Sequence, residues 1–288
     1  MYGYMGKILR INLTDRTVKK EDLDFELAKK YLGSRGLGVK IMMDEVPANV
    51  DPLSPENKLI IASGGLTGAP VPTSGRYMVI TKSPLTGTIG ISNSGGFWGP
   101  QFKATGHDLI IFEGKADKPV YLYINDDQVE IRDADHLWGK TVSETTKILE
   151  EEFEGCKTLA IGPGGENLSL ISSIINDVDR AAGRGGVGAV MGSKNLKAIA
   201  VKGSKKVPLY DEEKTKEVSR AKVQILREDP VASGGLPSYG SAVLVNIINE
   251  SGILPVKNFQ ESYTDEADKI SGESLAEKHL VKNSACYR

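Results

Sequence analysis

Cysteine is nearly absent from this sequence, which has only Cys156 and Cys286 among its 288 residues. Two thiols so far apart do not form the disulfide framework of a small secreted protein, so we expect a reducing compartment. No run of 18 apolar residues occurs, which excludes a transmembrane helix on that criterion. The first 13 residues carry charges and no apolar stretch, unlike a secretory signal. Together these absences predict a cytoplasmic protein without membrane contact.

An excess of charge of one sign is also lacking. Lysine and arginine number 36 against 38 aspartates and glutamates, which gives a net charge of −2. This balance argues against nucleic acid or an anionic membrane as a partner. Hydrophobic residues make up 40% and charged residues 26%, as in ordinary globular proteins. The length predicts one large domain or two ordinary ones.

The periodicity of apolar residues predicts a strand-rich region followed by a helical one. Strands are expected at 7–13, 17–21, 59–62, 77–81, 88–91, 109–112, 120–124, 129–131, 158–161, 168–175 and 196–201. Helices are expected at 26–32, 39–46, 143–153, 211–227, 242–250 and 273–282, with Ser143 as an N-cap and 232–238 as a loop. We therefore predict an α+β fold with a first domain at 1–208 and an incomplete helical domain at 209–288.

A glycine-rich loop followed by a buried strand occurs twice. Gly95 and Gly96 precede the strand at 109–112, and Gly185 and Gly186 precede the strand at 196–201, about 89 residues later. In both copies a glycine ends the strand and a proline follows five residues on, at Pro119 and Pro208. Such self-similarity indicates two related halves with two equivalent sites, and chance similarity in a glycine-rich chain is the alternative.

The segment 179–192 combines seven glycines and alanines before Val190 with Arg180 and Arg184. Glycine lets a ligand approach the main chain, successive N–H groups bind anions, and arginine suits bidentate phosphate contact. These features point to a phosphorylated ligand. Gly183, Gly185 and Gly188 also satisfy a dinucleotide fingerprint, but the next strand begins too soon for a crossover helix. A structural turn with solvated arginines is the remaining alternative.

A second polar cluster lies around the strands at 77–81 and 88–91. It contains Arg76 before the first strand, Ser83 between the two, and Asn93 and Gly95 after the second. If the strands pair as a hairpin, Arg76 and Asn93 meet at one end and face one ligand. An amide side chain both donates and accepts, which suits a heteroaromatic edge. An ordinary polar turn is the alternative.

The sequence resembles the N-terminal domain of the tungsten-dependent aldehyde:ferredoxin oxidoreductases. The resemblance covers effectively the whole chain and rests on collinear segments: Pro55-Glu-Asn-Lys-Leu-Ile, Thr81-Lys-Ser-Pro-Leu-Thr-Gly, Asn93-Ser-Gly-Gly, Trp138-Gly-Lys and Arg180-Ala-Ala-Gly-Arg-Gly-Gly-Val-Gly-Ala-Val-Met-Gly. It implies two β-sheets related by a pseudo-twofold axis, with a bis-pterin tungsten cofactor (tungstopterin) lying over them. Each of the two glycine-rich loops would then contact one pterin.

The resemblance also implies roles for particular residues. One pterin would contact Arg76, Asn93 and Gly95, and the other Arg180, Ala181, Gly183 and Arg184. A Mg²⁺ ion between the pterin phosphates would be held partly by the main-chain carbonyls of Asn93 and Ala181. The tungsten would take sulfur ligands from the pterins and none from the protein.

The C-terminus departs from the family pattern. The family carries a C-x-x-C-x-x-x-C stretch that supplies three ligands of a [4Fe–4S] cluster; Cys286 matches the first, and the given sequence stops before the second. One thiolate cannot hold a cluster that needs four. The family's acid–base residues also lie beyond residue 288, so no catalytic residue is assigned. We expect a chain that is the cofactor-holding front of a longer enzyme and is inactive alone.

The function implied by resemblance is oxidation of aldehydes to carboxylic acids, with electrons passing through tungsten and a [4Fe–4S] cluster to ferredoxin. The residues do not distinguish tungsten from molybdenum, and a homodimer of the longer enzyme is allowed. Three alternatives stay open: a non-catalytic cofactor-binding fragment, a nucleotide-binding protein using Gly183–Gly188, and a family relative acting on an aromatic acyl thioester. The three histidines are interpreted as surface or satisfied side chains, Trp98 and Trp138 as core or loop anchors, and Cys156 as an inert packed thiol.

Overall fold

The computed structural model describes residues 1–285. The described chain forms two compact units, Met1–Glu212 and Glu213–Ala285. They divide close to the position at which the sequence changes to a helical pattern.

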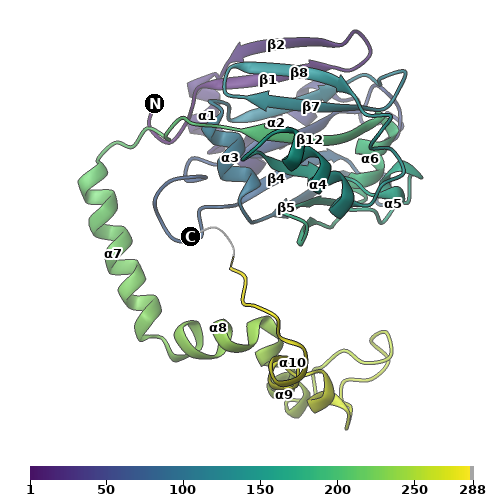
Figure 1. Cartoon of the computed structure of the whole chain (residues 1–288). Coiled ribbons are helices and arrows are strands. Elements are labelled where there is room, and N and C mark those ends of the chain that lie inside the picture. Colours follow the sequence, from purple (N-terminus) through teal and green to yellow (C-terminus); the bar gives the residue numbers. More distant parts are fainter. Residues whose placement is uncertain (286–288) are drawn as a thin grey trace. The chain divides into compact units, whose positions relative to one another are not determined.

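The first unit contains two six-stranded sheets (Figure 1). Sheet 1 comprises β1 (Lys7–Asn12), β2 (Thr17–Asp22), β3 (Leu59–Ser63), β4 (Tyr77–Lys82), β5 (Ile89–Ser94) and β6 (Leu109–Glu113). Sheet 2 comprises β7 (Val120–Asn125), β8 (Gln128–Asp133), β9 (Lys157–Ala160), β10 (Ile174–Asn176), β11 (Arg180–Ala182) and β12 (Leu196–Lys202).

The two sheets have the same topology. Sheet 1 has the order β2-β1-β6-β3-β4-β5, and sheet 2, taken in reverse, has the order β8-β7-β12-β9-β10-β11. Each strand of the first sheet thus corresponds to the strand six numbers later. The pairings agree as well: β1–β6 and β7–β12 are parallel, whereas the others are antiparallel. The two related halves predicted from the repeated glycine-rich loop are confirmed. We call residues 7–113 the first repeat and residues 120–202 the second repeat.

Alternation along the strands produces three hydrophobic layers. The largest core cluster joins the facing sides of both sheets, with Leu9, Ile61 and Phe112 from sheet 1 and Leu122 and Ile199 from sheet 2. The outer face of sheet 1 is covered by α1 (Phe25–Tyr31) and α2 (Ser34–Glu45). The outer face of sheet 2 packs against α4 (Val142–Glu152). A strand that contributes to two layers is apolar on both faces, so strands such as β3 and β7 are short continuous apolar runs that are predictable from sequence.

Both glycine loops lead into a short helix that sequence analysis did not predict. These helices are α3 (Trp98–Ala104) and α6 (Val187–Ser193), and side chains of both belong to the core cluster between the sheets. Neither helix has the apolar periodicity of an amphipathic helix. Helix α3 contains Gly99 and Pro100, and α6 is buried on all sides. Helix α6 begins within the fingerprint and contains its third glycine, Gly188. It is not a dinucleotide-binding crossover, because the preceding strand, β11, does not neighbour β12.

Three local expectations are wrong. The N-cap of α4 is Thr141, not Ser143, because Thr141 and Glu144 form a reciprocal capping box. Of the strand expected at 168–175, only Ile174 and Ile175 lie in a strand, β10, and the residues from 168 to 173 form turns and irregular backbone after the short helix α5 (Pro163–Glu166). The loop expected at 232–238 is helical.

The second unit consists of one long helix followed by short helical segments. They are α7 (Glu212–Glu228, which begins at the division), the π-helix Val231–Gly235, α8 (Leu236–Tyr239), the 3-10 helix Gly240–Val243, α9 (Leu244–Glu250), the 3-10 helix Ala267–Ile270 and α10 (Gly272–His279). The stretch Val231–Glu250, with mean hydropathy 1.3, has the length and composition of a membrane span, although no such helix was expected. Its four separate pieces, and Gly240 at φ 61°, distinguish it from one regular helix.

Candidate functional site

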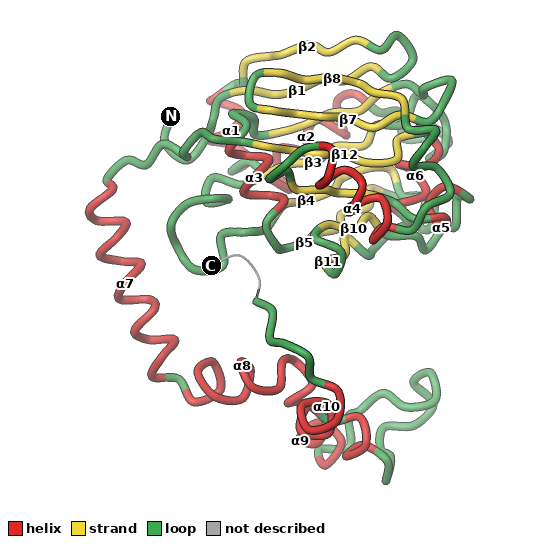
Figure 2. Tube along the Cα trace, in the orientation of Figure 1, coloured by secondary structure: helices red, strands yellow, loops and turns green. Residues whose placement is uncertain are grey.

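The equivalent edge strands β5 and β11 contact each other and bring the two predicted clusters together (Figure 2). A hollow of about 500 Å³ lies there, lined by Ser92, Asn93, Ala181, Gly183 and Arg184. Two of these residues come from the first repeat and three from the second. One recess is therefore built by corresponding parts of both repeats.

The first cluster has the predicted hairpin geometry. Strands β4 and β5 pair antiparallel, with Met78 opposite Asn93. The Arg76 guanidinium donates to Asn93 Oδ1 at 2.9 Å, and both side chains are exposed. Strand β5 extends to Ser94, so Asn93 lies within the strand rather than after it. The hairpin is confirmed, and it fixes a cation and an amide beside the hollow.

In the described chain, few carboxylates lie near the arginines of the second cluster. Arg180 lies in β11 with a 24% exposed side chain, not in an open loop as expected, and its nearest carboxylate oxygen is Asp179 Oδ2 at 3.6 Å. The Arg184 guanidinium has no hydrogen bond or ion pair with any residue of the described chain. An exposed cation at a glycine-lined recess attracts an anionic group such as a phosphate.

The two glycine loops differ in how strictly they require glycine. At Gly183 a Cβ would make only ordinary contacts, with Ser173 Oγ at 3.5 Å and Ala181 Cβ at 3.8 Å. Gly96 has φ 84°, and a Cβ there would lie 2.2 Å from Asp177 Oδ2. The backbone beside Gly95 therefore approaches the second repeat as closely as glycine alone permits.

The donor set suits a phosphorylated organic cofactor better than a directly bound metal. Within residues 1–285 no group of three or more histidine, cysteine, aspartate or glutamate side chains converges on a potential metal position. Asn93 and Ala181, predicted to hold Mg²⁺ through their carbonyls, line the same hollow. Cys286 lies outside the described residues.

Sequence reasoning missed Asn176 and Asp177, which contact the first glycine loop from the second repeat. Their side chains reach Gly95 and Phe97, about 80 positions earlier in the chain. In the sequence these two residues stand out only because they are close to Arg180. That proximity does not predict their contacts with Gly95 and Phe97.

His107, Trp98 and Cys156, to which no ligand role was assigned, are buried. His107 is buried beside the Thr105 hydroxyl, and burial together with nearby lysines lowers its pKa to about 4. Trp98 is fully buried and donates to Ile199 O. Cys156 is 1% exposed, and burial raises the pKa of its thiol.

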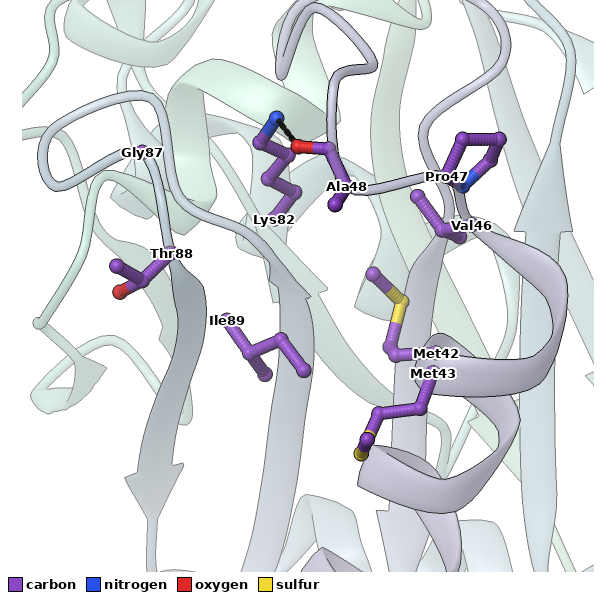
Figure 3. A pocket seen from close by; sticks show the side chains of 9 residues that line it. All are labelled: Met42, Met43, Val46, Pro47, Ala48, Lys82, Gly87, Thr88 and Ile89. Atoms are coloured by element: carbon purple, nitrogen blue, oxygen red, sulfur yellow. Dashed lines mark hydrogen bonds between the residues drawn. The ribbon is translucent and has the colours of Figure 1, made fainter.

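A different hollow of about 380 Å³ lies between the end of α2 and the β4–β5 turn (Figure 3). Met42 and Ile89 lie on opposite sides of it, and Lys82 Nζ donates to Ala48 O at 2.6 Å. Lys82 is the only charged residue among the nine that line it. This hollow lacks the arginines and glycine loops of the first one.

Comparison with known proteins agrees with this geometry. Residues 8–203 match the model of the aldehyde ferredoxin oxidoreductase N-terminal domain. The chain belongs to the aldehyde ferredoxin oxidoreductase family. Residues 217–288 match the family's model for domains 2 and 3.

Several archaeal members of the family are similar along the whole chain. The tungsten-containing aldehyde ferredoxin oxidoreductase of Pyrococcus furiosus is 59% identical over 289 residues, covering 100% of this chain and 48% of that protein. The enzyme of the same name from Pyrococcus abyssi is 57% identical with the same coverage. The WOR-like subunit of an aliphatic sulfonate oxidoreductase of Pyrococcus furiosus is 37% identical over 306 residues, covering 98% of this chain and 47% of that protein.

A solved structure has the same fold. The active-site complex BamBC of benzoyl coenzyme A reductase, in complex with 1,5-dienoyl-CoA, superposes with a TM-score of 0.87 and 34% identity. The match covers 99% of this chain and 46% of that one. This chain thus spans about half the length of the relatives that it matches.

Proposed function

We propose that this chain is the cofactor-holding N-terminal part of an enzyme that oxidises aldehydes to carboxylic acids. The observation that carries the proposal is the hollow shared by the two repeats, with its glycine backbone and the guanidinium of Arg184. Identity of 56–59% with tungsten-containing aldehyde ferredoxin oxidoreductases over the whole chain supports it. In the overall reaction an aldehyde and one water give a carboxylic acid, two protons and two electrons. Ferredoxin accepts the two electrons.

The protein's own contribution is to bind and orient the cofactor. When bound, a bis-pterin tungsten centre supplies the two-electron chemistry. Arg76, Arg180 and Arg184 neutralise and orient the phosphates, and Asn93 presents an amide to a pterin edge. The glycine loops at Gly95 and Gly183 let the main chain approach both pterins. The carbonyls of Asn93 and Ala181 would help to hold a Mg²⁺ ion, which would neutralise phosphate charge.

Electron transfer and assembly belong to the same proposal. Cys286 supplies one thiolate of a [4Fe–4S] cluster, and the remaining ligands come from the rest of the full-length protein. That protein acts in the cytoplasm as a homodimer, apart from membranes and nucleic acids.

The two arginines that flank Ala181 and Gly183 provide the test. In the full-length protein, Arg180→Ala combined with Arg184→Ala should weaken cofactor retention by about 100-fold, because two charge-assisted contacts are lost. Tungsten by elemental analysis and pterin by fluorescence after release measure this loss. Arg16→Ala is the matched control, because Arg16 pairs with Asp133 away from the hollow. Undiminished tungsten and pterin in the double variant would show that the site lies elsewhere.

An acyl thioester is the second candidate substrate class, because the 34% identical structural neighbour is a benzoyl coenzyme A reductase complex. Assays of the full-length protein with aldehydes plus an oxidised viologen, and with an aromatic acyl thioester plus a reduced viologen, distinguish the two. Turnover of the thioester alone would favour the second candidate.

A further inference from the structure

A buried amide connects the two repeats directly beneath the glycine loops. Asn176, at the end of β10, is fully buried, and its Oδ1 accepts from the Tyr77 hydroxyl at 2.8 Å and from Ser94 Oγ at 2.7 Å. Its Nδ2 donates to Gly95 O at 3.0 Å and to Asp177 Oδ2 at 2.8 Å. Since these last two partners can only accept, the orientation of the amide is determined, and all four of its hydrogen bonds are formed.

The neighbouring carboxylate holds the backbone of the same loop. Asp177 Oδ2 accepts from Phe97 N at 2.6 Å and, more weakly, from Trp98 N at 3.4 Å. Asp177 has φ 50° and Val178 has φ 66°, and a valine is rarely found in this left-handed region. Two successive residues in such a conformation indicate that the contact determines the local backbone.

The reverse arrangement holds the loop of the second repeat. Ser92 Oγ, from the first repeat, accepts from Arg184 N at 3.0 Å. Ser83 Oγ, also from the first repeat, donates to Gly185 O at 2.8 Å. Each glycine loop is therefore fixed by side chains of the other repeat, so the separation of the two loops depends on these bonds.

We propose that Asn176 and Asp177 are positioning residues that set the place of the Gly95–Phe97 loop relative to the Arg184–Gly185 loop, so that both fit one cofactor. Ser83 and Ser92 of the first repeat likewise hold the Arg184–Gly185 loop of the second repeat in place. This inference rests on the proposed function, because it concerns the fit of a ligand that spans both loops. It goes further in assigning the spacing of the loops to four side chains, of which Asn176, Asp177 and Ser83 do not line the hollow.

The test compares Asp177→Ala with Asp177→Asn in the full-length protein. Asparagine keeps an oxygen to accept from Phe97 N and Asn176 Nδ2, whereas alanine keeps none. We expect Asp177→Ala to lower tungsten and pterin content by about tenfold or more, and Asp177→Asn to restore most of it. In cofactor-free protein, the Phe97 amide should exchange its hydrogen about 100-fold faster in Asp177→Ala than in Asp177→Asn.

Asp126→Ala is the matched control. Asp126 also has positive φ, 48°, and also accepts from a backbone amide, that of Ser204, but it lies in the β7–β8 turn. We expect its cofactor content and its electron paramagnetic resonance spectrum to match the wild type, whereas the cofactor remaining in Asp177→Ala should give a broadened spectrum. If Asp177→Ala does not fold, Asp177→Ser replaces it, because a serine hydroxyl is too short to reach Phe97 N.

The outcomes separate the two proposals. Wild-type protein that contains neither tungsten nor pterin would overturn the proposed function itself. Wild-type protein that is loaded, together with Asp177→Ala of equal cofactor content, unchanged spectrum and unchanged Phe97 exchange, would overturn the positioning role alone.

Discussion

Lys194 is a completely buried cation enclosed by carbonyl oxygens. Its ammonium group donates to Asn57 O at 2.6 Å, Gly114 O at 2.9 Å and Pro55 O at 3.3 Å. No carboxylate lies within ion-pair distance among the described residues, although Glu113 and Glu56 exert a longer-range attraction and Lys58 a repulsion. Burial dominates and lowers the pKa of Lys194 from 10.5 to about 8. Lys194 thus attaches the second repeat to segments that precede it.

Replacing Lys194 should destabilise the fold by an amount that depends on pH. Lys194→Met leaves three carbonyls without their donor, at a cost of roughly 3 kcal/mol or more. Because the folded pKa lies below the unfolded one, the unfolded state binds the proton more tightly between about pH 8 and 10.5. The contribution of Lys194 to stability therefore rises with pH through this window. Urea unfolding of both proteins at pH 7.5 and pH 10 should give a larger difference at pH 10; an equal difference would contradict the lowered pKa.

At the scale of single elements, α4 shows how a helix start is chosen. Thr141 Oγ1 accepts from Glu144 N, and the Glu144 carboxylate accepts from Thr141 N at 2.8 Å. Ser143, two positions later, is exposed and already inside the helix. A capping box satisfies two backbone donors at once, which Ser143 cannot do from its position.

Substitution at these two positions should therefore have unequal effects. Thr141→Ala should lower the free energy of unfolding by about 1 kcal/mol. Ser143→Ala, the matched control two residues away, should change it by less than about 0.5 kcal/mol. Chemical denaturation monitored by circular dichroism measures both changes. Equal losses in the two variants would show that the helix begins elsewhere.

Elements differ in how far their sequence predicts them. Strands such as β1 and β7 were predictable because one side of each faces the shared core and the other faces a helix layer. Helices α3 and α6 were not, because buried residues and glycine remove their periodicity. Arg76 and Asn93 could be paired from a local hairpin, whereas the contact of Asn176 with Gly95 depends on how two repeats pack. Local patterns specify strands and hairpins, and the loop spacing of the site is a tertiary property.

At the scale of the first unit, the two repeats share one core. The central cluster takes Leu9, Ile61 and Phe112 from the first repeat and Leu122 and Ile199 from the second, all at most 1% exposed. The buried Trp98 donates across the repeats to Ile199 O at 3.1 Å. Separating the repeats would expose one complete face of each sheet, so the two repeats are interdependent layers rather than two independent domains.

Neither repeat should therefore fold alone. Exposing even five large apolar side chains costs about 7–15 kcal/mol, which equals the whole stability of a typical domain. A fragment of residues 1–116, and one of residues 117–212, should each lack a cooperative unfolding transition and a dispersed amide NMR spectrum. A fragment of residues 1–212 should show both, because it retains the complete shared core. Mixing the two shorter fragments should restore a dispersed spectrum, since each supplies the apolar face that the other lacks. Cooperative unfolding of fragment 1–116 by itself would instead mean that sheet 1 and its helices α1 and α2 are stable without the second layer.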